Sequence, residues 1–531
     1  MITKVPDRVR VIACALAAAV LAADAQPADR ELTASSKRAA IAAATPEAVE
    51  AALAALRAGG NAVDAAAAAA FALMVTDPAM CSLGGRSQIL IRLADGTVSA
   101  VDGATRVPGT VGPPALKGEG YQTCAVPGSP AALEEMVRSH GRLPLRVSVQ
   151  PAIRLARDGF VVSGELHDQL CRHRESLERY PGSARHFLKT DGRCPGEGER
   201  LLQPVLARTL EAIADGGAGV LYRGRFARAI ARDMATNGGY ISEHDLTRYR
   251  PLPGVVLKDG YRDLEVLARG DQCDGASVIE ALHMLEQYPV AGLERFGFEA
   301  LHLIAQSIYI ATADEHLPDW MQLSRELGLR RGREIDLSRR LPVSVRTSRS
   351  PEDGETNHLS VADAEGNAVA ITQSIGPILG TKVANPELGF FYAYSYTMNE
   401  NPVPYQRDKT SQAPTILLRE GKPCLVLGSA GSVRIPGSVI QTILNVVDFG
   451  MALDQAIAAP RIFLYNNELR IETAGVAADV VSAFERLGYK VRGYDRQDGW
   501  FGRVHGVTVD QHDLTLHAAA DPRDLGAAGG L

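Results

Sequence analysis

The stretch ETNHLSVADAEGNAVAITQSI, residues 355–375, places a threonine at the head of a strand-like run. Apolar residues alternate with polar or small ones, which predicts one strand over residues 359–362 and a second over residues 368–374. Residues 363–366 between them have the composition of a tight turn. The sequence therefore predicts a β-hairpin with Thr356 at its open end.

Thr356 is a candidate catalytic nucleophile. A threonine hydroxyl is a poor nucleophile unless a base lies within hydrogen-bond reach. Cleavage of the chain before Thr356 would supply that base, because an α-amino group titrates near pH ~8 and accepts protons at neutral pH. The alternative is that Thr356 simply begins a strand.

Two polar, charge-rich segments, residues 191–200 and 329–355, are predicted to be exposed connections. The second leads directly into Thr356. It is either the flexible chain that self-cleavage needs or an ordinary surface loop.

The composition is that of one large folded unit. The 531 residues are 46% hydrophobic and 22% charged, which suits a single two-sheet domain better than a string of small modules. The net charge of -6 argues against nucleic acid or an anionic membrane as a partner.

The N-terminus has the pattern of a secretory signal peptide over residues 1–25. Three basic residues precede an apolar run at residues 11–23, which is too short to span a membrane, and Ala23-Asp24-Ala25 is a small-x-small cleavage site. Residues 11–14, which end in Cys14, can also be interpreted as a lipoprotein attachment site. No later run of 18 apolar residues exists, so we expect a periplasmic or secreted protein without a membrane anchor after signal removal.

Six cysteines follow the signal peptide, and an even number permits disulfides in an oxidising compartment. Cys171 and Cys194 are the nearest pair in sequence, although the count does not establish pairing. No C-x-x-C spacing supports a metal site, and no cofactor is expected. The six are Cys81, Cys124, Cys171, Cys194, Cys273 and Cys424.

The first structured region is predicted to be a strand followed by two helices. Residues 38–43 form the apolar strand. Thr45 as N-cap and Pro46 at the first helical position begin a helix that Gly59-Gly60 ends. Residues 61–74 are almost all alanine and other apolar residues, which indicates a buried helix.

Ordered blocks along almost the whole chain resemble the gamma-glutamyltranspeptidase family. The blocks are residues 44–73, SLGGRS (82–87), residues 125–163, residues 221–251, TNHLSVADAEGNAVAITQS (356–374), APTILL (413–418), LGSAGSVRI (427–435), residues 448–462 and AAADPR (518–523). The resemblance implies an α+β fold, the four-layer αββα sandwich of the N-terminal-nucleophile hydrolases.

The resemblance assigns Thr356 as the nucleophile and the Glu355-Thr356 bond as the cleavage site. Residues 26–355 would form a large subunit and residues 356–531 a small one, both within one αββα domain. Ser374 matches a hydroxyl that hydrogen-bonds the nucleophile, or it is a strand-end serine bonded to backbone. Gly431 and Ser432 match the residues whose N–H groups form the oxyanion hole.

The residues that would bind substrate depart from the family pattern. Thr410 and Ser411 match a hydroxyl pair that helps to hold a substrate carboxylate. The residues that grip a γ-glutamyl zwitterion are replaced, however, and the replacements are Ala104, Gly376, Ser395 and Met398. The loss of each charged partner would weaken binding of a γ-glutamyl group by a few kcal/mol in a desolvated pocket.

Two arginines are candidates for a rebuilt anion site. These are Arg86 in the Gly-rich loop and Arg106 beyond Ala104, and the alternative is that both are surface residues. With a two-residue insertion in the alignment, Glu400 could take the place of the missing acid.

The sequence thus predicts an exported, self-cleaving threonine hydrolase or acyltransferase. Its substrate would be a small amide or peptide-like molecule whose acyl part is not a plain γ-glutamyl group. The alternatives are a true γ-glutamyl hydrolase with a rebuilt clamp, a bond-cleaving enzyme of specialised metabolism, and a binding protein that has lost catalysis.

Overall fold

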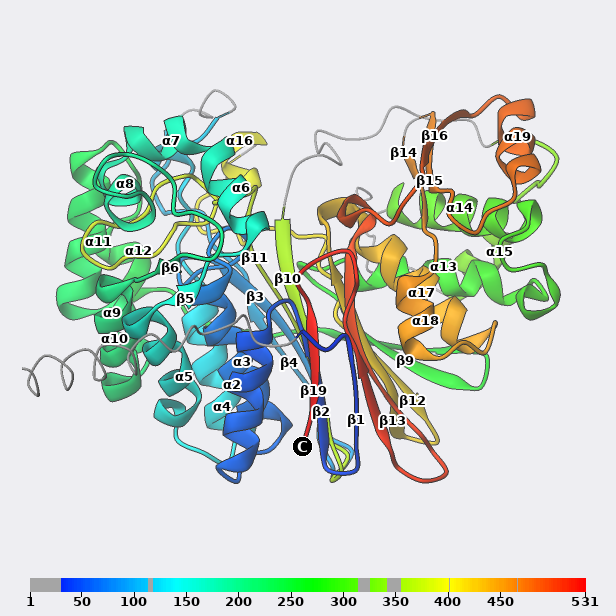
Figure 1. The fold of residues 1–531 in the computed structure, drawn as a ribbon, viewed down its shortest axis with the longest axis horizontal. Helices are drawn as coiled ribbons and strands as arrows, with labels where there is room; N and C mark the ends of the chain where they lie inside the picture. Colours follow the sequence, from blue (N-terminus) through cyan, green and yellow to red (C-terminus); the bar gives the residue numbers. More distant parts are fainter. Residues whose placement is uncertain (1–29, 113–117, 314–324, 341–354, 401, 466) are drawn as a thin grey trace, which may run out of the picture.

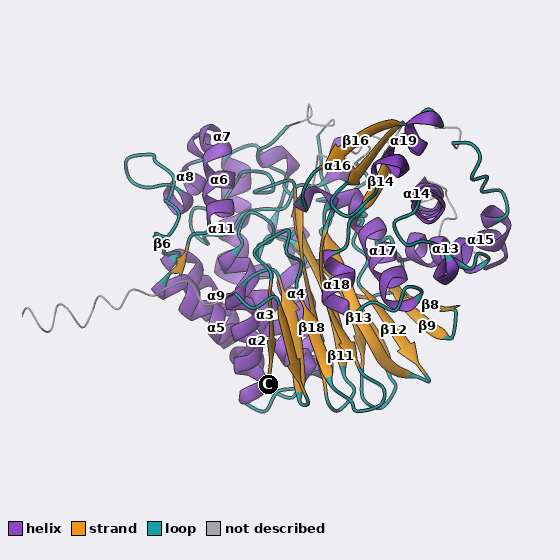
Figure 2. Cartoon of the chain, turned by 45° about the vertical axis from the view of Figure 1, so that its right-hand side comes forward, coloured by secondary structure: helices purple, strands orange, loops and turns teal. Residues whose placement is uncertain are grey.

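The computed structural model describes residues 30–112, 118–313, 325–340, 355–400, 402–465 and 467–531. Two seven-stranded sheets face each other, and helices cover both outer faces, so the protein is a four-layer αββα sandwich (Figure 1). Figure 2 shows the two sheets between the helical layers. The predicted fold class is confirmed.

The first sheet, here called sheet A, pairs its neighbouring strands in the antiparallel sense. In spatial order it contains β1 (Thr33–Ser36), β18 (Leu516–Ala519), β17 (Arg503–Val509), β13 (Lys422–Ala430), β12 (Thr415–Arg419), β9 (Leu264–Arg269) and β8 (Val256–Tyr261).

The second sheet, sheet B, carries the predicted hairpin near its centre and is also antiparallel. Its order is β19 (Ala527–Gly530), β2 (Ala39–Ala43), β10 (Glu355–Asp363), β11 (Ala368–Gly376), β3 (Arg86–Arg92), β4 (Val98–Gly103) and β7 (Leu252–Pro253). Two small sheets lie outside the sandwich, β5 (Phe160–Val161) with β6 (Arg200–Leu201), and β14 (Ile462–Tyr465) with β15 (Glu468–Glu472) and β16 (Lys490–Tyr494).

The helices divide between the two outer faces (Figure 1). On the side of sheet B lie α2 (Pro46–Arg57), α3 (Ala62–Thr76), α4 (Ser129–His140), α5 (Leu145–Asp158), α6 (Gly164–Arg172), α7 (Arg174–Arg179), α8 (Pro181–Phe187), α9 (Pro204–Gly216), α10 (Gly219–Tyr222), α11 (Gly224–Thr236), α12 (Glu243–Thr247) and the short α16 (Tyr396–Glu400). On the side of sheet A lie α13 (Gly275–Glu286), α14 (Phe298–Ala313), α15 (Arg325–Gly332), α17 (Ile435–Val447), α18 (Leu453–Ala458) and α19 (Ala478–Arg486).

The predicted N-terminal helices form as the sequence indicates. Thr45 caps α2 by accepting a hydrogen bond from the N–H of Ala48, and Pro46 is its first residue. Asn61 caps α3 in a capping box with Asp64, and every residue of α3 is buried. The small side chains of α3 let it pack closely against α2, α5 and the hairpin of sheet B.

Small residues also line the space between the sheets. This inner layer is built largely from alanines of β2, β10 and β11, with Leu267, Ile416 and Val426 of sheet A opposite them. Two larger apolar clusters separate each sheet from its own helices. The thin inner layer brings the facing strands of the two sheets into direct contact.

Two local predictions were wrong in their bounds. The first strand of the hairpin begins at Glu355 and not at residue 359, because Asn357 and His358 already pair with Gln373 and Thr372 of β11. The predicted connection over residues 329–355 begins as helix, since α15 runs to Gly332.

Tertiary contacts explain the second difference. Arg331 of α15 forms an ion pair with the buried Glu280 of α13, and the side-chain amide of Gln287 donates to the carbonyl of Leu329. Residues 341–354, the part of this connection next to the hairpin, lie outside the described residues.

Cys171 and Cys194 form a disulfide that joins α6 to the loop before β6. Cys81, Cys124, Cys273 and Cys424 are free thiols. Among the described residues, no helix combines the length and the apolar character that crossing a bilayer requires.

Candidate active site

The strand ends of both sheets bring the predicted site residues to one end of the sandwich. In sheet B, Glu355 pairs with Gly376 and Ser374 pairs with Arg86, so the start of β10, the end of β11 and the start of β3 lie together. Ser87 pairs with Gly103, which places Ala104 at the same end.

Sheet A contributes its own strand ends to this site. Thr415 at the start of β12 pairs with Leu427, so Thr410 and Ser411, which precede β12, lie at the end of β13 where Gly431 follows. Ala430 pairs with Arg503, and Arg503 lines a small cavity together with Asn357 of β10. The start of β10 and the end of β13 therefore meet.

Alternation along β10 determines which way Thr356 points. Leu359 and Val361 pack into the helix-side cluster, whereas Ser360 donates a hydrogen bond to the carbonyl of His505 in sheet A. The residues of even number from His358 to Ala362 thus face the other sheet. The β10–β11 register shifts between Glu355 and Asn357, and continued alternation along β10 directs Thr356 to the same face. Its side chain is buried, on the same face of sheet B as Ser374.

His358 is the next residue after Thr356 on this face of β10. It is fully buried, and an added Cβ on Gly428 would lie 2.3 Å from its Cε1, so β13 passes directly against the ring. Because the Ser360 hydroxyl donates to His505, it accepts from Nε2 of His358 at 2.9 Å, and Thr372 Oγ1 donates to Nδ1 at 2.9 Å.

The same contacts settle the charge of His358. Burial, with the nearby His505, holds its pKa well below the ordinary value for histidine. The ring is therefore a neutral structural bridge, and the base for Thr356 has to come from another group.

The loop after β13 contains the two residues that the sequence predicts for an oxyanion hole. Gly431 has φ 130° and Ser432 has φ 57°, so both residues lie in the left-handed region. Within the described part of the chain, no hydrogen bond takes up the backbone N–H of Gly431 or Ser432. Two adjacent amides of this kind are the arrangement that oxyanion holes use, and they lie at the same end of the sandwich as the start of β10.

Thr410 and Ser411 form a turn that is fixed from both sides. The hydroxyl of Thr410 accepts from the N–H of Gln412 at 2.8 Å, and the N–H of Thr410 donates to the carbonyl of Gln272 at 2.8 Å. Both side chains are buried at the shared end of the sandwich.

Asp408 is a residue of the site that the sequence did not reveal. Thr105 Oγ1 donates to its Oδ2 at 2.7 Å, and Ser395 Oγ donates to its Oδ1 at 2.6 Å. The N–H of Met398 in turn donates to Ser395 Oγ. Asp408 is fully buried, and of the predicted substrate positions Ser395 contacts it directly, Met398 contacts it through Ser395, and Ala104 adjoins its partner Thr105.

No pattern in the sequence could have identified Asp408. It stands 303 positions from Thr105, and only the fold joins the two. The same is true of Asn357, whose side-chain amide donates to Asp77 Oδ2 at 3.0 Å across 280 positions.

The two candidate arginines differ in their surroundings. Arg86 is buried, its Nη2 donates to the carbonyl of Tyr394 at 2.6 Å, and that nitrogen lies 3.5 Å from where a Cβ at Gly376 would stand. It therefore lies directly beside the altered clamp position at Gly376, and it is not a surface residue.

Arg106 is turned toward α12. Its guanidinium donates to the carbonyls of Asp245 and Arg248 and lies near the rings of Tyr249 and Tyr405. These contacts make Arg86 the better candidate for an anion site. The side chain of Glu400 lies outside the described residues.

A polar cavity lies on the helix side of β10. It has a volume of about 20 Å³ and is lined by residues that include Asp77, Glu165, Asn357, Arg503 and Asp524. A space of this size holds about one water molecule. Burial is the main cause that raises the pKa of Asp77 to about 7, and the negative charge of Glu165 adds to it. Asn357 and Arg503 favour the ionised form but do not offset these two effects.

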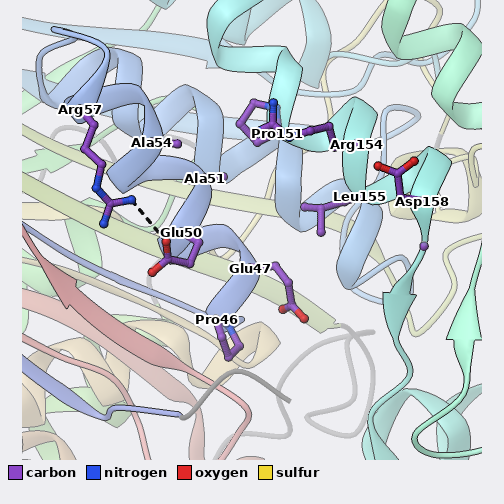
Figure 3. Close-up of a pocket in the computed structure, with 11 residues that line it drawn as sticks. Pro46, Glu47, Glu50, Ala51, Ala54, Arg57, Pro151, Arg154, Leu155 and Asp158 are labelled. Atoms are coloured by element: carbon purple, nitrogen blue, oxygen red, sulfur yellow. Dashed lines mark hydrogen bonds and ion pairs between the residues drawn. The ribbon is translucent and has the colours of Figure 1, made fainter. Parts of the chain in front are cut away.

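A larger pocket of about 410 Å³ lies between α2 and α5 (Figure 3). Its lining combines Glu47, Glu50 and Asp158 with Arg57 and Arg154 over apolar residues, and it contains none of the predicted site residues. In the described ranges, no group of three or more histidine, cysteine, aspartate or glutamate residues could hold a metal ion.

Comparison with known proteins agrees with this architecture. The family model of gamma-glutamyltranspeptidase matches residues 48–531. The "Glutathione hydrolase proenzyme" of Escherichia coli K12 is 32% identical over 518 residues, which cover 88% of each chain. The "Acylase ACY 1 proenzyme" of Pseudomonas sp. strain V22 is 32% identical over 516 residues, covering 90% of this chain and 91% of the relative.

Solved structures give the same result. Cephalosporin acylase from Bacillus halodurans superposes with a TM-score of 0.84 at 26% identity, covering 96% of this chain and 98% of that one. Gamma-glutamyltranspeptidase of Helicobacter pylori superposes with a TM-score of 0.51 at 29% identity, over 54% of this chain and 86% of that one. The chain therefore belongs to the gamma-glutamyltranspeptidase family and is an enzyme of the hydrolase and transferase type found there.

Proposed function

We propose that the chain is a precursor that cleaves its own Glu355-Thr356 bond and then uses Thr356 as the nucleophile of an amide hydrolase or acyltransferase. The observation that supports this proposal is that the start of β10, which holds Thr356, lies at the same end of the sandwich as the end of β13, which leads into the oxyanion loop, here defined as residues 430–434. The name proenzyme, which both relatives carry, supports it.

Each group would have a defined part in the reaction. In self-cleavage, Thr356 Oγ attacks the Glu355 carbonyl, its proton passes to the departing amine, and water hydrolyses the resulting ester. In turnover, the freed α-amino group takes the hydroxyl proton while Thr356 Oγ attacks the substrate carbonyl. The amides of Gly431 and Ser432 hold the oxyanion in both reactions, and Ser374 hydrogen-bonds the nucleophile.

Self-cleavage can be tested with a denaturing gel and N-terminal sequencing. Wild type should run as two pieces, the smaller of which begins at Thr356, and Thr356→Ala should run as one. Thr356→Ser retains a hydroxyl and should still process. An intact, fully active wild type would contradict the mechanism.

For the substrate, we propose an acyl group that resembles γ-glutamyl but lacks its ammonium. Ala104 provides no cation for the substrate carboxylate. Met398 is a buried apolar side chain at the position where the family pattern has an acid that binds the substrate ammonium. An unpaired ammonium would lose its hydration without gaining a partner. Arg86 beside Gly376 can replace the partner of the carboxylate, as the arginine fork suits carboxylates.

A matched pair of anilides tests this specificity. Glutaryl and γ-glutamyl p-nitroanilide differ only in the ammonium, and kcat/KM should be about tenfold or more higher for the glutaryl compound, since an unpaired buried charge costs at least ~1.4 kcal/mol. Adding glycylglycine as acceptor should help little. Ala104→Arg with Met398→Asp should raise γ-glutamyl turnover.

One observation favours a second candidate, a γ-glutamyl hydrolase with a rebuilt clamp. Asp408 is a buried acid among the altered clamp positions, and Arg86 is a cation beside another. Two results together would establish this candidate and exclude the first. The wild type would cleave the γ-glutamyl anilide efficiently, and this activity would fall in both Asp408→Asn and Arg86→Met.

Export to the periplasm or medium is also proposed. The signal-like N-terminus and the Cys171–Cys194 disulfide both fit an oxidising compartment. N-terminal sequencing of the larger piece should find a start near Gln26. A start at Met1 in the mature protein would contradict export by this route.

A further inference from the structure

Four buried charged side chains form a closed network behind the oxyanion loop. Arg461 contacts Asp521 at 2.7 Å, Arg523 contacts Asp521 at 3.1 Å, and Arg523 also contacts Glu472 at 2.5 Å. The backbone N–H of Arg461 donates to Glu472 at 2.9 Å, which closes the ring. These four side chains are each at most 2% exposed.

Acidic and basic side chains alternate in the network, and its arginines hold the Asp521 carboxyl in its ionised form. Although burial raises the pKa of Asp521, the charges of Arg461 and Arg523 lower it to about 2. Removing one member of such a ring leaves its partner buried and unpaired, which is far more costly than losing an exposed ion pair.

The network holds the segment over residues 498–504 at both ends. Glu472 accepts from the N–H of Asp498 at 2.8 Å, and Asp521 accepts from the N–H of Val504 at 2.8 Å. Between these points, Arg461 Nη1 donates to the carbonyl of Gly502 at 2.5 Å. The position of Gly502 therefore depends on Arg461.

Gly502 packs directly against the oxyanion loop. An added Cβ on Gly431 would lie 2.9 Å from the Cα of Gly502, and one on Gly502 would lie 2.8 Å from Ser438 Oγ and 3.0 Å from Ser429 Oγ. Ser429 donates to the carbonyl of Arg503 at 3.1 Å, joining β13 to the residue after Gly502. Gly431 and Gly502 thus pack too closely for a side chain at either position, and a shift of Gly502 would alter the packing of Gly431.

We propose that Arg461 is a positioning residue that sets the geometry of the oxyanion loop through Gly502. This rests on the proposed function, in which the amides of Gly431 and Ser432 stabilise the transition state. Arg461 lies behind Gly502 and is not a catalytic residue. Its effect is to keep two amide donors aimed at the position where the negative oxygen forms.

The test uses the full-length chain with Arg461→Lys and Arg461→Met. Small shifts of transition-state donors lower kcat and leave substrate binding nearly intact. We expect kcat to fall about tenfold in the lysine variant and about a hundredfold in the methionine variant, with KM within about twofold. Self-cleavage should slow by a similar factor, because the same amides serve both reactions.

The control is Arg262→Lys, which alters a partly buried arginine that, like Arg461, pairs with a buried acid, here Asp448. Arg262 lies at the turn between β8 and β9, at the other end of sheet A. This variant should lower the melting temperature and leave kcat unchanged. Hydrogen exchange should become faster in peptides covering residues 430–434 and 498–504 of Arg461→Lys, but not of Arg262→Lys.

The possible outcomes distinguish failure of the positioning role from failure of the proposed function. A wild type that neither processes nor hydrolyses any acyl anilide overturns the proposed function and this inference with it. An active wild type with equal kcat and unchanged exchange in Arg461→Lys overturns the positioning role alone. An equal loss of kcat in Arg262→Lys also overturns it, because the effect would then follow general stability.

Discussion

At the scale of single residues, backbone conformation separates the two members of the oxyanion loop. Gly431 adopts φ 130° with no space for a Cβ, because Gly502 lies 2.9 Å from where that atom would stand. Ser432 adopts φ 57°, a conformation that L-residues reach at a cost of roughly 1–2 kcal/mol. Strain of this kind is often found where backbone groups have to point at a reacting atom.

Substitutions at Gly431 and Ser432 should differ in their effect on kcat. Ser432→Gly removes the strain and keeps the amide, so kcat should stay within about threefold and unfolding free energy should change by no more than ~1 kcal/mol. Gly431→Ala should lower kcat about a hundredfold by displacing a donor. Steady-state kinetics and urea unfolding measure both effects. Equal kcat in the two variants would remove Gly431 from the oxyanion hole.

At the scale of elements, the junction of α3 with β10 contains a carboxyl group whose ionised form is destabilised by burial. Asp77 is the C-cap of α3, and it accepts a hydrogen bond from Asn357, the residue after the proposed nucleophile. Burial outweighs that bond and raises the pKa of Asp77 to about 7 from 3.8. The charged form is therefore disfavoured at this junction.

The raised pKa of Asp77 predicts the sign of a pH dependence. Between pH 3.8 and about 7 the folded state binds the proton more tightly than the unfolded state, so stability falls as pH rises through this window and is level above it. Asp77→Asn removes this loss and should stabilise the protein by on the order of 1–4 kcal/mol at pH 8, and by less at pH 5.

The measurement is urea unfolding of the Thr356→Ala single chain, with and without Asp77→Asn, at both pH values. Glu50→Gln, an exposed change on α2, is the control and should show no such pH dependence. A stability gain that is the same at pH 5 and pH 8 would refute the raised pKa.

At the scale of the whole molecule, strands from before and after residue 355 are interleaved in both sheets. In sheet B, β10 and β11 lie between β2 and β3, and in sheet A, the four strands β18, β17, β13 and β12 lie between β1 and β9. Residues from both sides of the proposed cleavage site also share the apolar layer between the sheets. Cutting one bond at the edge of the sandwich removes none of these contacts.

The two pieces should therefore remain associated after self-cleavage. They should elute together in size-exclusion chromatography without denaturant and separate only in urea or detergent. Thr356→Ala, which should not be cut, should elute at the same volume. Separate elution of the wild-type pieces in buffer would mean that the strands pair differently from the order described above.

Local sequence patterns determined much of this protein. Alternation and turn composition predicted the β10–β11 hairpin, and capping residues predicted α2 and α3, because these signals act between neighbours in the chain. Ordered motifs predicted the family and the four-layer fold. The first residues of β10 and the helix α15 were missed, since pairing with β11 and packing on α13 decide them.

Only the tertiary structure decided how the site is assembled. Asp408 meets Thr105 across 303 positions, Asn357 meets Asp77 across 280, and Gly502 meets Gly431 because two strands of sheet A are neighbours. From the sequence, Arg86 is either part of a rebuilt anion site or a surface residue, and the fold buries it beside Gly376. Burial, pKa and contact between distant residues depend on the packing of whole sheets, which no local pattern encodes.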